Sequence, residues 1–245
     1  MHLKGKVALI TGSDGGIGLA IAEALAAEGC SVVRNGPAEC KETLGTYYVA
    51  DVGRREAIER MLKDIGPIDI LVNNAVVRHF HPIEEFPVEE WERALAVNVT
   101  AAFHAIRLAL PGMRQRDWGR IINMASHYSS RGCERRVDYV VSKHAIAGLT
   151  RTVALEVAQS GITCNAIQPG WVHTPHAERQ IAEEMEKSGR SREQAMIALL
   201  ESRQPSRRLV PPGDIAAMAV FLCSQAAANV NGALLPVDGG WSVAP

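Results

Sequence analysis

Short β-rich runs alternate with longer helical patterns along nearly the whole chain. The runs typical of strands are KVALIT (6–11), SVV (31–33), TYYVAD (46–51), IDILVNN (68–74), RIINMAS (120–126), ITCNAIQP (162–169) and ALLPV (233–237). The helical patterns cover 16–28, 53–65, 89–113, 139–159 and 213–224. Strict alternation of this kind indicates right-handed crossovers between parallel strands. The sequence therefore predicts an α/β, doubly wound Rossmann fold with a seven-stranded parallel sheet flanked by helices.

Two segments depart from the even spacing. The segment GPAECKETLG, between the second and third strands, contains a proline and two glycines, so we expect its crossover helix to be shortened or absent. The segment 173–210 is a long insertion with two charged amphipathic patterns broken at Gly189. Because it follows the sixth strand at the carboxyl edge of the sheet, where such folds bind ligands, it predicts a helical substrate lid.

Length and composition suit one domain spanning residues 1–245, with 47% hydrophobic and 22% charged residues. A net charge of −1 provides no general attraction to nucleic acid or to an anionic membrane, so neither is expected as a partner. No apolar run of 18 residues occurs, and the N-terminus leads directly into the first strand, which predicts neither a membrane span nor a secretory signal. Five cysteines without a CxxC pair favour a reducing compartment, and we expect a cytoplasmic protein.

A glycine-rich turn, TGSDGGIG (11–18), follows the first strand and opens the first helix. Gly12, Gly16 and Gly18 suit a backbone that turns tightly and approaches a pyrophosphate, while the helix N-terminus supplies unpaired N–H groups. Taken alone, the same turn also fits a tight strand-to-helix connection without a ligand.

Several motifs, in this order, resemble those of the short-chain dehydrogenase/reductase family. They are the TGxxxGxG spacing, Asp51-Val52, NNA at 73–75, Asn98, the set Ser126, Tyr139 and Lys143, Pro169-Gly170, and DGG at 238–240. The resemblance covers the whole chain, with Val76 as a departure where the family has glycine. It implies an NAD- or NADP-dependent oxidoreductase that acts on a CH–OH group.

The resemblance also implies a dinucleotide site along the carboxyl edge of the sheet. The residues it assigns to the cofactor are Gly12, Asp14, Gly16, Ile17, Gly18, Asp51, Val52, Asn74, Ala75, Tyr139, Lys143, Pro169, Gly170, Val172 and Thr174. The acidic residue typical of NAD users is missing after the second strand, where Arg34 either pairs with a 2′-phosphate, packs in the sheet or lies in solvent. Asp14 would repel a 2′-phosphate, so the sequence favours NAD, with NADP as the alternative.

Tyr139 and Lys143 lie four residues apart in a predicted helix, so their side chains share one face. A nearby ammonium lowers the pKa of a phenol, which lets the tyrosine act as a general base. The family resemblance implies that role, with Lys143 also holding the nicotinamide ribose. It further implies that Ser126 hydrogen-bonds the substrate oxygen and that Asn98 completes a proton relay. Taken singly, each of the four also fits an ordinary packed or solvated position.

Within the family, NNAVVRHF, RIINMAS, NAIQPGWVHTP, ERQI, RQPS and VDGGWSVA resemble the D-3-hydroxybutyrate dehydrogenase branch. The resemblance implies that two tryptophans and a lid glutamine enclose a small acid. It also marks a difference, because Arg78, Arg136 and Tyr128 stand where the branch grips a carboxylate with glutamine, lysine and histidine. The substrate site predicted in this way is Arg78, Ser126, Tyr128, Arg136, Tyr139, Trp171, Gln180 and Trp241.

Two guanidiniums suit a substrate more anionic than 3-hydroxybutyrate, such as a phosphonate or a dicarboxylate analogue. The alternative is that Arg136 replaces lysine conservatively and Arg78 turns to solvent. A conventional D-3-hydroxybutyrate dehydrogenase, an NADP-dependent 3-oxoacyl or carbonyl reductase, and a non-catalytic dinucleotide sensor remain the alternative functions. His176, early in the lid, either lines the pocket or lies in solvent. No metal site is expected, and the resemblance implies a homo-oligomer, a tetramer in the family.

Overall fold

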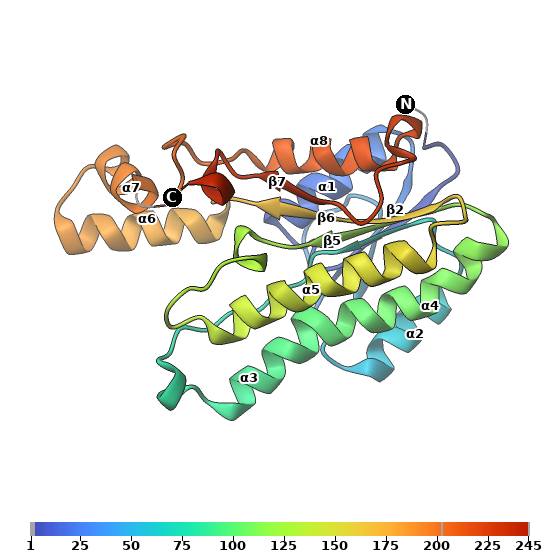
Figure 1. Ribbon diagram of the computed structural model, residues 1–245, viewed down its shortest axis with the longest axis horizontal. Helices are drawn as coiled ribbons and strands as arrows, with labels where there is room; N and C mark the ends of the chain where they lie inside the picture. Colours follow the sequence, from blue (N-terminus) through green and yellow to red (C-terminus); the bar gives the residue numbers. More distant parts are fainter. Residues whose placement is uncertain (1–2, 202, 245) are drawn as a thin grey trace.

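The computed structural model describes residues 3–201 and 203–244, which include a sheet of seven parallel strands in the order β3-β2-β1-β4-β5-β6-β7 (Figure 1). The strands are β1 (Val7–Ile10), β2 (Ser31–Gly36), β3 (Thr46–Val49), β4 (Ile70–Asn73), β5 (Gly119–Met124), β6 (Ile162–Pro169) and β7 (Leu234–Val237). The predicted doubly wound sheet is confirmed. Its strand order reverses between β1 and β4, and the carboxyl ends of strands at such a point are where these folds bind ligands.

Helices cover both faces of the sheet (Figure 1). One face carries α1 (Gly16–Ala27) and α8 (Pro212–Cys223), and the other α2 (Arg55–Ile65), α4 (Ala101–Gln115) and α5 (Val137–Glu156). The stretch predicted as one helix over 89–113 is instead α3 (Val88–Leu95), a π-helical turn (Ala96–Thr100) and α4. Short 3-10 turns lie at Ile83–Glu85, His127–Ser129, Gln225–Ala227 and Trp241–Val243.

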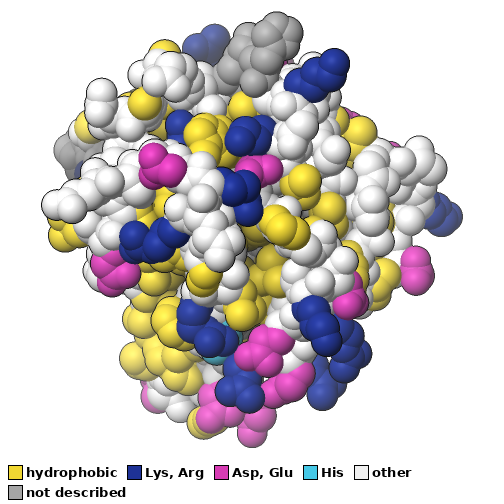
Figure 2. Space-filling model, turned by 90° about the vertical axis from the view of Figure 1, so that its right-hand side faces the viewer, with side chains coloured by type: hydrophobic (Ala, Val, Ile, Leu, Met, Phe, Trp, Pro, Cys, Tyr) yellow, Lys and Arg dark blue, Asp and Glu magenta, His cyan; other side chains and the backbone are white. Residues whose placement is uncertain are grey.

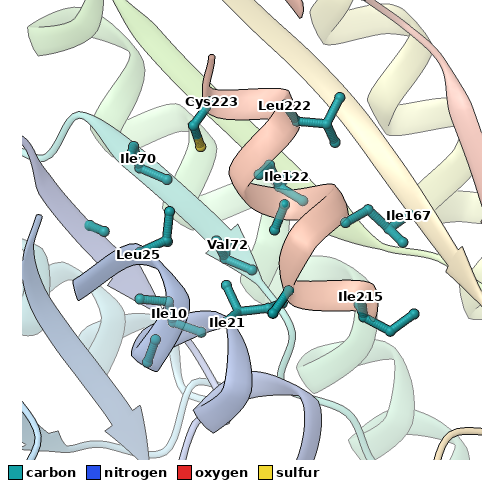
Figure 3. Packing of buried hydrophobic residues seen from close by; sticks show 14 of the residues in the cluster. Ile10, Ile21, Leu25, Ile70, Val72, Ile122, Ile167, Ile215, Leu222 and Cys223 are labelled. Carbon is teal, nitrogen blue, oxygen red and sulfur yellow. The ribbon is translucent and has the colours of Figure 1, made fainter. Parts of the chain in front are cut away.

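The core has one apolar layer on each face of the sheet. Figure 3 shows the layer under α1 and α8, where Ile10 and Val72 from neighbouring strands meet Ile21, Ile215 and Leu222 from the two helices. Side chains alternate between the faces of a strand, so the intervening residues join the layer under α2, α4 and α5. Burying one such side chain contributes about 1.5–3 kcal/mol. Strands buried on both faces explain the nearly continuous apolar runs in the sequence.

Residues 37–45, between β2 and β3, form no helix, as the spacing predicts. The fully buried Arg34 organises this segment: its Nε donates to the Leu44 carbonyl (2.8 Å) and its Nη2 to the Glu42 carbonyl (2.6 Å). Its Nη1 reaches the Ser13 carbonyl in the glycine-rich turn (3.4 Å). Of the three alternatives for Arg34, packing within the sheet is therefore correct, and pairing with a 2′-phosphate is wrong.

The inserted segment after β6 forms two helices, α6 (Pro175–Ser188) and α7 (Arg192–Glu201), which project beyond the carboxyl ends of the strands (Figure 1). The predicted break at Gly189 is confirmed, because this glycine ends α6 in the left-handed conformation (φ 67°). Backbone hydrogen bonds from His173 N to Val210 O (2.9 Å) and from Val210 N to Trp171 O (2.9 Å) close the base of the insertion.

One helical stretch among the described residues, Val88–Gln115, is long and apolar enough to cross a membrane by length and composition. Within this fold, however, Ala105, Ile106 and Met113 of α4 are buried in the core layer that contains α2. The stretch therefore serves here as a core helix. On the face turned away from the lid, acidic and basic side chains are interspersed, without one large patch of a single sign (Figure 2).

Candidate active site

A cavity of about 420 Å³ runs along the carboxyl edge of the sheet and continues under the lid. One end is lined by Gly12, Asp14, Gly15, Ile17, Asn35, Gly36, Pro37, Ala50, Asp51, Val52, Asn74, Ala75, Arg93, Pro169, Gly170, Val172 and Thr174. The other end is lined by Arg78, Ser126, His127, Tyr128, Arg136, Tyr139, Lys143, Trp171, His176, Gln180, Arg203 and Trp241. The structure thus brings nearly all the predicted cofactor and substrate residues to one continuous cavity.

The glycine-rich turn shapes the first end of the cavity. Gly12 has φ +60°, and a Cβ there would lie 2.7 Å from Ala75 Cα. Gly16 and Gly18 do not line the cavity, although both were predicted to bind the cofactor. Gly18 is needed for packing instead, because a Cβ there would lie 2.6 Å from Asn74 Nδ2. The start of α1 at this edge offers the unpaired N–H groups that suit a pyrophosphate, so the turn fits a dinucleotide.

Hydrogen bonds join the glycine-rich turn to the segment after β4. Asn74 Nδ2 donates to the carbonyls of Thr11 (3.1 Å) and Gly12 (2.6 Å). The Thr11 hydroxyl accepts in turn from the backbone N–H groups of Asn74 (3.0 Å) and Ala75 (3.2 Å). These bonds therefore fix the two motifs, which lie 62–64 residues apart in the sequence, relative to each other across the crevice between β1 and β4.

Asp51 lies at the same end and is already paired. Its two oxygens accept from Nη1 (2.9 Å) and Nη2 (2.8 Å) of Arg93, and the Gly53 N–H adds a third bond (2.9 Å). Burial opposes ionisation of Asp51, but these bonds outweigh it and lower the pKa of the carboxyl. Sequence reasoning did not identify Arg93, because the pair forms only when α3 folds across the end of β3.

Ser126, Tyr139 and Lys143 meet where the two ends of the cavity join. Ser126 follows β5 and lines the cavity beside Tyr139, and Lys143 Nζ lies 5.3 Å from the centre of the tyrosine ring. The buried Lys143 ammonium donates to the Met124 carbonyl (2.5 Å), which fixes its position. Burial opposes ionisation of Tyr139, but the charges of Lys143 and Arg78, together with the Ser126 hydroxyl, outweigh it and lower the pKa of the phenol. Burial, reinforced by Arg78, also lowers the pKa of Lys143.

Asn98, predicted to be catalytic, is buried in the π-helical turn, and its side chain does not line the main cavity. Its Oδ1 accepts from Val77 N (2.8 Å), and its Nδ2 donates to Val77 O (2.8 Å) and to Ser142 Oγ (3.2 Å). Both amide hydrogens are therefore used in holding the segment after β4 against α5. The part of Asn98 in a proton relay stays a prediction.

Two histidines extend the predicted substrate end. His127 stacks on Trp241 with ring centroids 3.4 Å apart, and burial, together with nearby guanidiniums, lowers its pKa to about 3. His176 of α6 lines the cavity, and burial, with Arg78 as the next cause, lowers its pKa to about 4. Both imidazoles are therefore neutral at pH 7 and can donate or accept a hydrogen bond. Among the residues that the structure describes, no group of three or more His, Cys, Asp or Glu side chains is placed to hold a metal ion.

Arg203, between α7 and the base of the lid, also lines the substrate end, although sequence reasoning did not assign it a role. Its backbone position is set by Gln204, whose Oε1 accepts from Trp171 N (2.8 Å). The only sequence signal was its place in RQPS, one of the segments that carry the branch resemblance.

Known proteins resemble this chain in sequence and fold along nearly its whole length. A family model described as enoyl-(acyl carrier protein) reductase matches residues 12–242. The chain is 46% identical to the D-beta-hydroxybutyrate dehydrogenase of Cupriavidus necator, covering 98% of each chain, and 41% identical to that of Rhizobium meliloti, covering 97% of this chain and 98% of the relative. The structure of L-sorbose reductase from Gluconobacter frateurii, complexed with NADPH and L-sorbose, superposes with a TM-score of 0.90 at 32% identity, over 98% of this chain and 97% of that one. As its motifs predict, the chain belongs to the short-chain dehydrogenase/reductase family, whose members include dehydrogenases and reductases that act on CH–OH groups.

Proposed function

We propose that the protein reversibly oxidises the secondary alcohol of a small anionic hydroxy acid with NAD, and that Tyr139 is the general base. The observation that supports this most directly is the meeting of Ser126, Tyr139 and Lys143 in one cavity with a lowered Tyr139 pKa. Its dinucleotide end provides the turn for a pyrophosphate, and its other end provides guanidiniums and tryptophans for a small acid.

The proposed reaction removes two hydrogens from the alcohol. A bound nicotinamide supplies the hydride acceptor for the hydrogen on the carbon. The Tyr139 phenolate takes the hydroxyl proton while Ser126 donates a hydrogen bond to the same substrate oxygen, and a carbonyl remains. Lys143 stabilises the phenolate through its charge, and its bond to Met124 O holds it in place. In the reverse direction, Tyr139 returns the proton to the oxygen.

The cofactor preference for NAD rests on the end of β2. Gly36 and Pro37 line the cavity there, beside the exposed Asp14 carboxylate. Arg34 is turned into the loop, and Arg93 is paired with Asp51. A 2′-phosphate would therefore meet a carboxylate and find no free guanidinium from these two residues. Solved relatives with bound NADP or NADPH make NADP the alternative to be tested.

The substrate preference rests on Arg78 and Arg136, which line the cavity where a carboxylate-binding glutamine and lysine are implied by the branch resemblance. We propose a substrate more anionic than 3-hydroxybutyrate. Identity of 46% to a D-beta-hydroxybutyrate dehydrogenase favours the conventional substrate as the second candidate. A reductase of acyl carriers fits less well, because Trp171, Gln180 and Trp241 line the substrate end beside the lid, an arrangement that suits a small free acid.

The test is the initial rate of NADH formation with (R)-3-hydroxybutyrate, (R)-malate and (R)-2-hydroxypropylphosphonate, repeated with NADP. Preference is compared as kcat/KM, because discrimination between substrates is expressed there. We expect NAD and an anionic analogue to be preferred. A clear preference for 3-hydroxybutyrate would support the conventional enzyme instead. Turnover equal to wild type in Tyr139→Phe would rule out the proposed base, and no turnover with any hydroxy acid would favour a dinucleotide sensor.

We extend the proposal to a cytoplasmic homo-oligomer, a tetramer by family resemblance. Leu155 of α5 is 80% exposed, and Phe103 of α4 is 48% exposed, so two neighbouring helices present apolar side chains at the surface. Sedimentation equilibrium of the purified chain checks the assembly, and a monomer at all concentrations would contradict it.

A further inference from the structure

Three guanidiniums approach the substrate end of the cavity from separate segments. Arg78 follows β4, Arg136 precedes α5, and Arg203 follows α7 in the lid. Within residues 3–201 and 203–244, no carboxylate pairs with any of these three side chains. The cavity's carboxylates, Asp14 and Asp51, line the dinucleotide end instead.

The neighbour of each guanidinium is an aromatic ring and not a carboxylate. The Cζ of Arg136 lies 4.2 Å from the ring centre of Phe80 and 5.8 Å from that of Tyr128. A contact of this kind uses the charge of the guanidinium and not its N–H donors, which remain available. The aromatic contact therefore fixes the cation without consuming the donors that grip an oxyanion.

The other two arginines have the same kind of partner at greater distance. The Cζ of Arg203 lies 5.9 Å from the Trp171 ring, and that of Arg78 lies 6.0 Å from the Tyr139 ring. Trp171 lies where the lid begins, and Tyr139 is the proposed general base. The three cations are thus distributed around the space where the acid group of a small substrate would lie.

The three charges are close enough to affect one another. Burial lowers the pKa of Arg136, and both Arg203 and Arg78 lower it further. The same arginines help to keep His127 and His176 neutral. Since uncompensated charges removed from water are costly, this end of the cavity is poised for a ligand with more than one negative charge.

We propose that Arg78, Arg136 and Arg203 together bind a doubly charged tetrahedral oxyanion, a phosphonate or phosphate group, on the part of the substrate remote from its alcohol. This rests on the proposed dehydrogenase function and adds Arg203 as a substrate ligand. A carboxylate has two oxygens and one charge, and one bidentate guanidinium satisfies much of it. A phosphoryl group has three acceptor oxygens and a charge of about −1.5 to −2, which matches three guanidiniums.

Arg203→Met tests the third guanidinium, because methionine keeps an apolar stem and removes the charge. The substrates are (R)-2-hydroxypropylphosphonate, its sulfonate analogue and (R)-3-hydroxybutyrate, at saturating NAD. The sulfonate keeps the tetrahedral shape with one charge, so it separates charge from shape. Arg207→Met is the matched control, because Arg207 is exposed and pairs with Glu201 (2.9 Å) on the surface.

We expect wild type to prefer the phosphonate. Arg203→Met should reduce kcat/KM for the phosphonate by about 10- to 100-fold, the effect of one lost charge-assisted hydrogen bond. The loss should be smaller for the sulfonate and smallest for 3-hydroxybutyrate, while Arg207→Met leaves all three unchanged. An equal loss for all three substrates, or no loss for the phosphonate, would overturn the proposal.

Calorimetric titration with methylphosphonate and acetate separates this proposal from the proposed function. Binding of methylphosphonate by wild type, weakened in Arg203→Met with an unchanged melting temperature, supports the oxyanion site even if no hydroxy acid is turned over. NAD-dependent turnover of 3-hydroxybutyrate without any preference for methylphosphonate over acetate would retain the dehydrogenase and overturn the oxyanion site.

Discussion

Opposing effects act on the ionisation of the Tyr139 phenol. Burial favours its neutral form, while Lys143, Arg78, Ser126 and Arg136 favour the phenolate and prevail. Two of the cations that lower its pKa are thus also the proposed ligands of the substrate's acid group. Recognition of the anion and activation of the base therefore share the same charges.

Removing one of these charges should shift the pH profile. In the oxidative direction, activity requires ionised Tyr139, so kcat/KM rises with pH through the pKa of this phenol. Arg78→Gln removes a positive charge that lowers that pKa, so the rising limb should move to higher pH. Arg135→Gln, at an exposed position on the neighbouring loop, is the control. A rising limb at the same pH in Arg78→Gln as in wild type would contradict the view that Arg78 lowers the pKa of Tyr139.

The fully buried Asp138 joins the proposed base to the loop that contains Arg78. It accepts from Tyr139 N (2.6 Å), His79 N (3.0 Å) and His79 Nδ1 (3.0 Å). In Asp138→Asn, an amide N–H₂ faces donors, so we expect a loss of about 1–3 kcal/mol in the free energy of unfolding. The control is Glu92→Gln at an exposed position, which should change the free energy of unfolding little, and urea unfolding measures this free energy for both variants. KM for the acid should also rise in Asp138→Asn, and an unchanged KM would argue that this link does not position Arg78.

At the scale of elements, the strands and most helices could be predicted because their apolar periods are long and regular. The π-helical turn at Ala96–Thr100 could not, since apolar residues continue through it and only the hydrogen-bonding register changes. Arg93 and Arg203 were missed for a related reason. Their partners, Asp51 and Trp171, lie far away in sequence and meet them only after α3 and the lid have packed.

The loop between β2 and β3 provides a test at the same scale. Arg34→Met removes the donors that hold the Leu44 and Glu42 carbonyls, so the wall at Gly36 and Pro37 should loosen. We expect a Kd for NAD raised about tenfold, consistent with the loss of one or more bonds from a charged donor, and a nearly unchanged KM for the acid. Fluorescence titration measures the Kd, with the exposed Arg60→Met as the control. An unaltered Kd in Arg34→Met would show that the wall does not depend on this side chain.

The whole molecule has a near-neutral net charge of −1, yet three arginines make the substrate end of its cavity cationic. Attraction of an anion is therefore local and should be screened by salt, with a Debye length of about 10 Å at 0.1 M. We expect kcat/KM for a dianion to fall as sodium chloride is raised, and to fall less in Arg203→Met. Initial-rate measurements of kcat/KM at several salt concentrations, for wild type and Arg203→Met, check this. Equal salt dependence in both proteins would argue against local steering by Arg203.

The placement of Arg203 on the lid has a consequence for the rate of turnover. The acid group that the three arginines would hold does not change when the alcohol becomes a ketone, so substrate and product are held equally. Such uniform binding lowers KM without speeding the chemical step. If Arg203 holds the acid group as proposed, release of the ketone requires the lid to withdraw this ligand, so lid opening is expected to limit kcat. With the acid group held in this way, we expect a low KM for the acid and a kcat set by product release.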